Sequence, residues 1–127
     1  MILRTGIDLV EISRFAELQE PLRVRFVQRV FTADEIADCR DSNEKLAGRF
    51  AVKEAVAKAL GCGIGEVSWQ EIEVQKLENG QPQLILHGRA QELAQALGLT
   101  QWSISLTHTA TQAAAVAVAV GEGQPPE

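Results

Sequence analysis

The stretch "GRFAVKEAVAKALG" (residues 48–61) decides the architecture of this chain, because it reads as one helix that is apolar on almost every side. A helix of that kind is buried by other elements, and we expect it to run over about residues 43–60. Asp41 or Ser42 suits its N-cap, and Gly61 suits its end, since glycine adopts the left-handed conformation at little cost. Charged residues nevertheless interrupt the stretch, at Arg49, Lys53, Glu54 and Lys58.

These four charges form two separate stripes along the helix. At about 100° per residue, Glu54 and Lys58 fall together among alanines, whereas Arg49 and Lys53 share another side. Alanines leave room for a ligand beside the first stripe, although a solvated i,i+4 ion pair would also explain Glu54 and Lys58. The second stripe has no acid of its own, so a nearby anion would favour Arg49 and Lys53.

The residues before this helix combine one strand with short helices. Residues 2–10 are expected to form a strand with Ile7 and Leu9 facing one way and Val10 the other. Glu35 stands three residues after a threonine, as in a capping box, which is a simpler interpretation than a catalytic role. The short helices are expected over residues 11–20, from Pro21 and from Thr32.

The residues after the long helix have the two-residue period of strands. The Asn79-Gly80 pair predicts the turn of a hairpin. Helices in the first half and antiparallel strands in the second predict an α+β fold, with an antiparallel sheet packed against one long helix and several short ones. We place one domain over residues 1–120 and a flexible tail over 121–127. The expected elements are strands at 69–77 and 83–88, a helix at 89–97, and strands at 102–108 and 112–120.

Composition excludes several classes of protein. The net charge of −5 over 127 residues argues against nucleic-acid binding. No stretch approaches the roughly 18 apolar residues of a membrane span, and "MILRTGIDLV" is not a signal peptide, because Asp8 interrupts its short apolar runs. Cys39 and Cys62 form no metal-type pair. We therefore expect a cytoplasmic protein.

Several polar residues stand where their setting needs an explanation. Asp8 interrupts an apolar strand, so it must be paired, hydrogen-bonded, metal-bound or exposed, for example as a helix cap. If Asp8 and Glu54 converged, the two carboxylates would form a hard oxygen site of the kind that holds Mg²⁺. His108 ends an alternating strand, and "GCGIG" (residues 61–65) can bring backbone N–H groups close to an anion. Both also fit plain surface positions.

A basic patch precedes the long helix. Four arginines lie between residues 14 and 29, against only Glu17 and Glu20. The patch is either a solvated face or a docking surface for an acidic partner. Its members are Arg14, Arg23, Arg25 and Arg29.

Taken together, these stretches resemble the holo-acyl-carrier-protein synthase family, the small phosphopantetheinyl transferases. The resemblance covers residues 3 to about 120. It implies an enzyme that moves 4′-phosphopantetheine from coenzyme A to a serine of acyl carrier protein and releases adenosine 3′,5′-bisphosphate, and typically a homotrimer with each site between two subunits. The segments that carry it are "GIDLVEISRF" (6–15), "FTADE" (31–35), "GRFAVKEAVAKALGCGIG" (48–65), "EIEV" (71–74), "NGQP" (79–82) and "SISLTHT" (103–109).

The resemblance also implies roles for single residues. Asp8 and Glu54 would bind Mg²⁺ and, with Lys58 beside the phosphates, carry catalysis. The proton of the serine would pass either to a water on Mg²⁺ or directly to a carboxylate. The implied carrier-protein contacts are Arg14, and Arg23 or Arg25. The implied coenzyme A contacts are Arg49, Phe50, Lys53, Gly61, Gly63, Gly65, Pro82 and His108.

The chain departs from the family pattern after His108, where Ala110-Thr111 replaces a charged pair. We therefore expect the loop there to contact phosphate differently. The alternative interpretation of the whole chain is a non-catalytic, oligomeric α+β module that binds a nucleotide or has a regulatory role. Such a module would tolerate loss of the Asp8 and Glu54 charges, whereas the enzyme would not.

Overall fold

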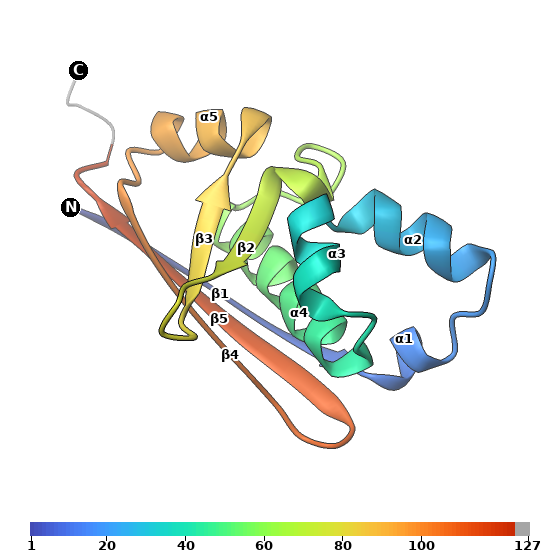
Figure 1. Cartoon of the computed structure of the whole chain (residues 1–127). Coiled ribbons are helices and arrows are strands. Elements are labelled where there is room, and N and C mark those ends of the chain that lie inside the picture. The colour runs from blue at the N-terminus through green and yellow to red at the C-terminus, as the bar shows by residue number, and fades with distance from the viewer. Residues whose placement is uncertain (124–127) are drawn as a thin grey trace.

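The long helix α4 (Asn43–Leu60) lies across one face of a three-stranded antiparallel sheet, and shorter elements cover its remaining sides (Figure 1). The computed structural model describes residues 1–123 of the chain. The shorter elements are helices α1 (Ser13–Ala16), α2 (Leu22–Val30), α3 (Ala33–Cys39) and α5 (Gly88–Ala96), the 3-10 helix η1 (Trp69–Glu71), and strands β1 (Ile2–Glu11), β2 (Ile72–Lys76), β3 (Pro82–Leu86), β4 (Gln101–His108) and β5 (Gln112–Gly121).

The bounds predicted for α4 are confirmed, and local chemistry explains them. Ser42 caps the start, because its hydroxyl accepts a hydrogen bond from the backbone N–H of Lys45. Gly61 ends the helix in the left-handed conformation, with φ at 74°. Between these caps the helix is buried on nearly all sides, as its apolar pattern predicts.

The three-stranded sheet has the order β1-β5-β4, and small residues let it approach α4 closely. Gly6 is the tightest point, since a Cβ atom there would lie 1.8 Å from the carbonyl oxygen of Ala55. Strand β5 presents a row of buried alanines to the helix, which are Ala113, Ala115, Ala117 and Ala119. The sheet and helix therefore pack along a smooth, alanine-rich contact.

The opposite face of this sheet is apolar and open. Leu3, Ile7 and Leu9 are 65%, 69% and 62% exposed, and Val116 of the neighbouring strand is also exposed. Val10 is buried on the other side, so the predicted alternation in β1 is confirmed. An exposed apolar sheet face of this kind is typical of a surface that another molecule covers.

The expected α+β class is confirmed, but the strands form two sheets, because β2 and β3 pair separately as a hairpin. Its turn contains Gly80 at φ 87°, as the Asn79-Gly80 pair predicted. The strand expected from residue 69 begins later, since Ser68 and Glu71 form a capping box that starts η1. The capping box of Thr32 and Glu35 at the start of α3 is confirmed.

The ends of the sheet also differ from the expectation in detail. Strand β1 continues through Glu11, and the helix expected over residues 11–20 shrinks to α1, because Ile12 N–H still bonds to the carbonyl of Thr111 beside β5. Strand β5 includes Gly121. The rest of the predicted flexible tail lies partly outside the described residues, which end at 123.

Candidate active site

Asp8 of β1 lies beside Glu54 and Lys58 of α4. The ammonium of Lys58 donates to Asp8 Oδ1 at 3.0 Å and to the carbonyl of Ile7 at 2.9 Å. Asp8 faces α4 because it shares a strand face with Gly6, whose missing side chain lets the two elements touch. Glu54 and Lys58 meet there because they stand one helical turn apart.

Charges and burial at this point act on the Glu54 carboxyl. Burial raises the pKa of Glu54, and the nearby carboxylate of Asp8 raises it further. The positive charges of Lys58 and Arg14 oppose this shift without reversing it. A carboxyl whose ionisation is disfavoured by burial and by a neighbouring carboxylate would gain from a cation beside it.

This donor set fits Mg²⁺. Among residues 1–123, no group of three or more His, Cys, Asp or Glu side chains could hold a metal ion. Mg²⁺ usually takes only one or two protein carboxylates and completes its shell with waters and phosphate oxygens. Asp8 and Glu54 can supply that pair, and Lys58 can supply a further positive charge to a bound phosphate.

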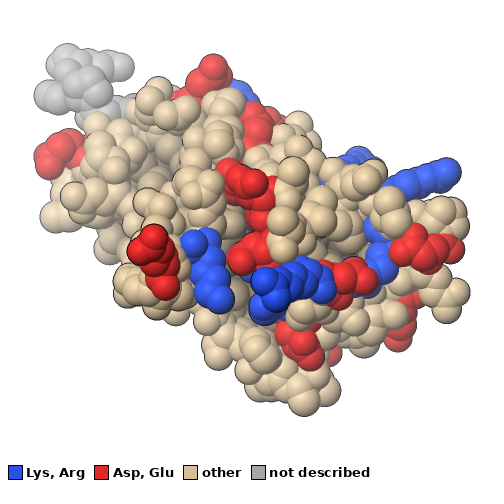
Figure 2. Space-filling view, in the orientation of Figure 1, with Lys and Arg blue, Asp and Glu red and all other residues tan. Residues whose placement is uncertain are grey.

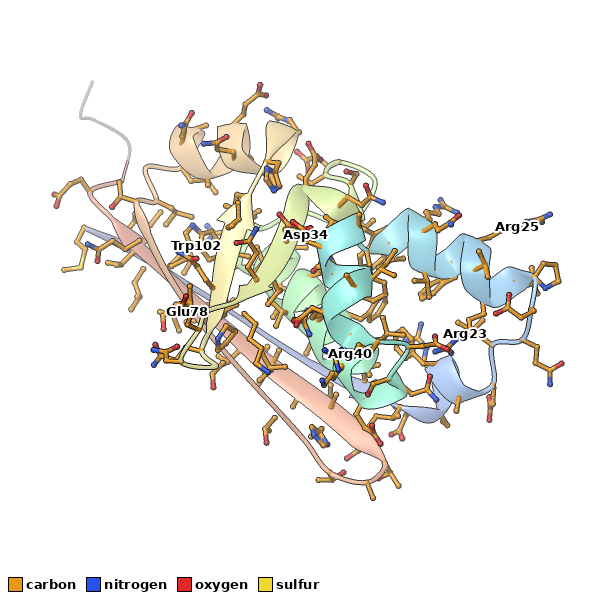
Figure 3. All side chains as sticks on the ribbon, viewed as in Figure 1. Arg23, Arg25, Asp34, Arg40, Glu78 and Trp102 are labelled. Atoms are coloured by element: carbon orange, nitrogen blue, oxygen red, sulfur yellow. The ribbon has the colours of Figure 1, made fainter. Side chains whose placement is uncertain are left out.

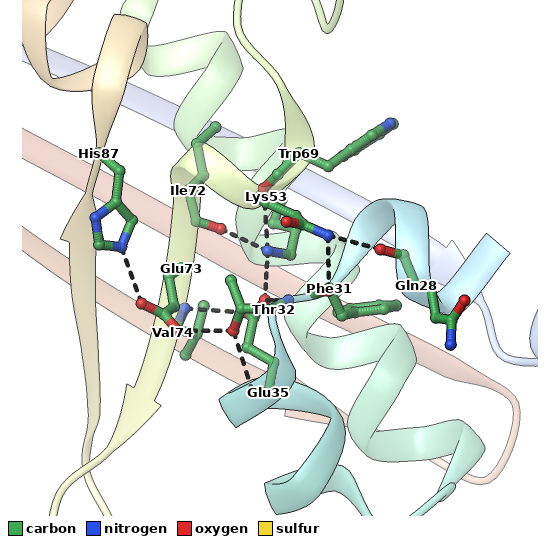
Figure 4. Close-up of polar contacts among 11 residues, drawn as sticks. Gln28, Phe31, Thr32, Glu35, Lys53, Trp69, Ile72, Glu73, Val74 and His87 are labelled. Atoms are coloured by element: carbon green, nitrogen blue, oxygen red, sulfur yellow. Dashed lines mark hydrogen bonds and ion pairs between the residues drawn. The ribbon is translucent and has the colours of Figure 1, made fainter. Parts of the chain in front are cut away.

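The second stripe of α4, Arg49 and Lys53, is buried. Lys53 is 0% exposed, and its ammonium donates to Glu35 Oε1 at 2.7 Å and to the carbonyls of Ile72 at 2.5 Å and Trp69 at 3.1 Å (Figure 4). Burial lowers the pKa of Lys53, and the charge of Glu35 partly offsets this effect. The prediction that Lys53 contacts coenzyme A is therefore not supported, because all three of its N–H groups have partners inside the protein.

Arg49 is also buried and forms an ion pair with Asp38 of α3. It nevertheless reaches a cavity of about 270 Å³ between α4, the β2–β3 hairpin and β4. Two lysines join it there, so the wall of the cavity carries more positive than negative charge. The lining includes Lys45, Lys76, Gly80, Pro82, Ser105 and Leu106, and Pro82 is one of the predicted coenzyme A contacts.

Phe50 is a core residue, and this does not support its prediction as a coenzyme A contact. Its ring stacks on Trp69 with centroids 4.8 Å apart and meets Phe15 edge to face. The guanidinium of Arg14 lies 5.4 Å from the centroid of the same ring. Phe50 is 4% exposed, so the cluster leaves almost no ring surface for a ligand.

The glycine loop after α4 and the end of β4 are open. A Cβ atom at Gly63 or Gly65 would meet nothing within 4 Å, so a ligand could approach this backbone closely. Gly61 is tighter, because the guanidinium of Arg4 lies beside it. His108 is exposed at the end of β4, and its Nδ1 lies 3.2 Å from the carbonyl of Thr109. The roles predicted for these residues remain predictions.

The arginines of the predicted docking surface divide into two kinds. Arg14 and Arg25 are exposed, and Figure 3 shows Arg25 extending away from α2. Arg23 instead donates to the carbonyl of Phe15 at 2.6 Å and pairs with Asp41 at 2.9 Å, with 13% of its side chain exposed. The prediction that Arg23 contacts a partner is therefore not supported. Basic and acidic side chains alternate across the face that Figure 2 shows.

Sequence reasoning missed several residues that shape the site. Arg4 donates to the carbonyl of Ala59 at 2.8 Å, close to the start of the glycine loop. Its position could have been inferred, because residues 4, 6 and 8 of a strand share one face. The ion pair of Asp38 with Arg49 had no sequence signal, since it depends on how α3 docks against α4.

Known proteins resemble this chain over most of its length. The holo-[acyl-carrier-protein] synthases of Herpetosiphon aurantiacus and Moorella thermoacetica are 48% and 47% identical to it, over 87% and 84% of this chain and 93% and 85% of their own. The structure of the Helicobacter pylori holo-[acyl-carrier-protein] synthase in complex with coenzyme A matches with a TM-score of 0.83 at 33% identity, covering 91% of this chain and 99% of that one. A family profile matches residues 4–119, and the chain therefore belongs to the 4′-phosphopantetheinyl transferase superfamily.

Proposed function

We propose that this protein transfers the 4′-phosphopantetheine group of coenzyme A to a serine of apo-acyl carrier protein. The observation that carries the proposal is the meeting of Asp8, Glu54 and Lys58 between β1 and α4. Family membership supports it, because the similar proteins are named holo-[acyl-carrier-protein] synthases and one of them was solved with coenzyme A. Among the described residues, no helix is long and apolar enough to cross a membrane.

In the proposed reaction the serine hydroxyl of the carrier attacks the phosphorus that bears pantetheine. A new oxygen–phosphorus bond forms, the bond to the adenosine bisphosphate breaks, and that nucleotide leaves. Asp8 and Glu54 would hold Mg²⁺, which when bound neutralises charge on the pyrophosphate. The ammonium of Lys58 would face the same phosphates. The carboxylates are the candidate acceptors for the serine proton, and its raised pKa makes the Glu54 carboxylate a stronger base than an ordinary carboxylate.

The positively charged cavity beside Arg49 is the proposed seat of the nucleotide. Its two lysines suit phosphate, whereas Arg49 is already paired with Asp38, and Pro82 and Leu106 offer apolar surface to a base. Asp8, Glu54 and Lys58 are not among the described residues that line this cavity. A complete site made from the cavity of one subunit and the carboxylates of another would join these two parts.

The open sheet face supports such an assembly. Leu3, Ile7 and Leu9 form an apolar surface that a monomer would leave in water. We propose that three copies of the chain pack through this face as a homotrimer. Arg14 and Arg25 remain exposed, and the charge of Arg14 acts on Glu54, so these arginines could meet an acidic carrier protein beside the site.

A transfer assay tests the proposed function. The protein is incubated with coenzyme A, Mg²⁺ and apo-acyl carrier protein, and the carrier is weighed by mass spectrometry. A gain of one phosphopantetheine that EDTA abolishes is the expected result. Absence of transfer to every carrier tested, by folded protein, would contradict the proposal and favour a non-catalytic nucleotide-binding module.

A further inference from the structure

On the side that faces the sheet, α4 packs through small side chains, which constrain the rotation of the helix about its axis less than large ones do. The helix contacts the sheet through small residues, such as Ala51 and Ala55 against the alanines of β5. Gly6 of β1 approaches the backbone of the helix itself. Between Leu46 and Leu60 only Glu54 and Lys58 are not buried, so contact with solvent does little to orient this part of the helix. Directional polar contacts therefore add to the control of this rotation, beside the stacking of Phe50 on Trp69.

Lys53 provides such contacts. Its ammonium bonds to a carbonyl of η1, a carbonyl of β2 and a carboxylate of α3, so three separate elements hold one side chain (Figure 4). The carboxylate partner is itself fixed, because Glu35 accepts hydrogen bonds from the backbone N–H groups of Thr32 at 2.9 Å and Val74 at 3.0 Å. Lys53 and Glu35 are fully buried, so water does not compete for these bonds.

We propose that the buried Lys53–Glu35 pair is a rotational pin that holds α4 so that Glu54 faces Asp8. Lys53 and Glu54 are consecutive on one helix, so fixing the direction of one side chain fixes the direction of the other. A rotation of about 20° would move a carboxylate at the helix surface by roughly 2 Å. A displacement of about 1 Å at a catalytic group can cost about 100-fold in rate. Lys53 is thus a positioning residue, and its role in catalysis rests on the function proposed above.

If Lys53 served the stability of the fold alone, its variants would behave differently from those of a residue that orients α4. Removing one partner of a buried ion pair leaves an uncompensated charge and destabilises the fold, whereas replacing both partners with neutral residues is often tolerated. Lys53→Met combined with Glu35→Gln therefore separates the two roles. The double variant keeps similar volumes and leaves no unpaired buried charge, but it loses the directional bonds of the ammonium.

The experiment compares wild-type protein, the double variant, Lys53→Arg and a control, Val56→Ala. Val56 is fully buried on the same helix, and its truncation weakens packing without touching the polar contacts. For each protein we measure the melting temperature, the turnover number at several Mg²⁺ concentrations, and the binding of Mn²⁺ in the presence of coenzyme A by electron paramagnetic resonance. All assays are run well below the lowest melting temperature.

We expect the double variant to bind Mn²⁺ about tenfold or more weakly, as variants of residues that orient metal ligands typically do, and to need more Mg²⁺ for turnover. Lys53→Arg, which keeps a buried cation, should recover part of the loss, and Val56→Ala should keep the wild-type metal dependence. Wild-type Mn²⁺ affinity and turnover in a folded double variant would overturn the pin and leave the proposed function standing. Wild-type protein that binds Mn²⁺ but transfers nothing would contradict the proposed function alone.

Discussion

Lys58 donates a hydrogen bond to Asp8 across 50 positions of the chain, and this contact joins the first strand to the end of the central helix. The ammonium balances only one of the two carboxylates at this point, because Glu54 lies there as well. Burial and the charge of Asp8 raise the pKa of Glu54. If these residues served only the stability of the fold, the protein would be more stable without one of the two carboxylates. Their retention in one place is typical of a site that binds a cation or a phosphate.

Replacing Glu54 should separate activity from stability. At neutral pH the raised pKa means that the ionised Glu54 carboxyl costs folding free energy, so Glu54→Gln should melt at the wild-type temperature or above it. The same change should abolish phosphopantetheine transfer, and Asp8→Asn should do likewise. Thermal unfolding and the mass-spectrometric transfer assay check both effects. Wild-type turnover in either variant would remove these residues from the proposed metal site.

The close approach of β1 to α4 at Gly6 predicts a large loss of stability on substitution. A Cβ atom there would clash with the backbone carbonyl of Ala55, so Gly6→Ala must separate the strand from the helix. We expect a loss of more than about 3 kcal/mol in the free energy of unfolding, measured by urea denaturation. Gly63→Ala is the matched control, because its surroundings are open, and it should change stability by less than about 1 kcal/mol. Similar losses in both variants would contradict the close packing.

We expect Glu73 to account for part of the loss of stability of the fold at low pH. Burial alone would raise the pKa of its carboxyl, but hydrogen bonds from Thr32 and His87 outweigh burial and lower it. A carboxyl whose pKa is lower in the folded state adds stability above its unfolded value, about 4.3, and loses it as the pH falls through the folded value. Glu73→Gln should therefore lower stability at pH 7 and flatten its decline below about pH 4. Urea denaturation at several pH values measures this, and an unchanged acid limb would disprove the role of Glu73.

We expect substitution of the exposed Arg14 to impair binding of a partner, and substitution of the internally bonded Arg23 to impair stability. Arg14→Glu should raise the KM for acyl carrier protein about tenfold or more while leaving the KM for coenzyme A nearly unchanged, because an exposed charge of the wrong sign repels an acidic partner. Arg23→Glu should instead lower the melting temperature, since it breaks the bonds to Phe15 and Asp41 and places like charges together. Steady-state kinetics with each substrate varied in turn distinguishes them. Equal effects of Arg14→Glu on both KM values would exclude a docking role.

Local signals in the sequence predicted much of the fold. The caps at Ser42 and Gly61 set the bounds of α4, and the Asn79-Gly80 pair set the hairpin, because each depends on residues within one turn. The division of the strands into two sheets was not predicted, since it depends on contacts between distant segments. The helix bounds were least certain where tertiary pairing intervened, as at Ile12.

The candidate site was likewise predicted only in part from the sequence. Helical periodicity placed Glu54 and Lys58 on one stripe of α4 and Arg49 and Lys53 on another. Periodicity could not tell which stripe would be open, because that depends on the acids that α3 brings to the second stripe. Glu35 and Asp38 neutralise that stripe inside the protein, so an external anion is not needed there. The charged residues of this largely buried helix thus have two roles. Arg49 and Lys53 pair with acids inside the protein, whereas Glu54 and Lys58 belong to the candidate site.

The most direct test of the central claim, that Asp8 and Glu54 share one divalent cation, is anomalous diffraction from crystals grown with coenzyme A and Mn²⁺. We expect one peak bound by a carboxylate oxygen of each residue, at about 2.0–2.2 Å. A cation held by only one of them, or bound elsewhere while the enzyme is active, would contradict it.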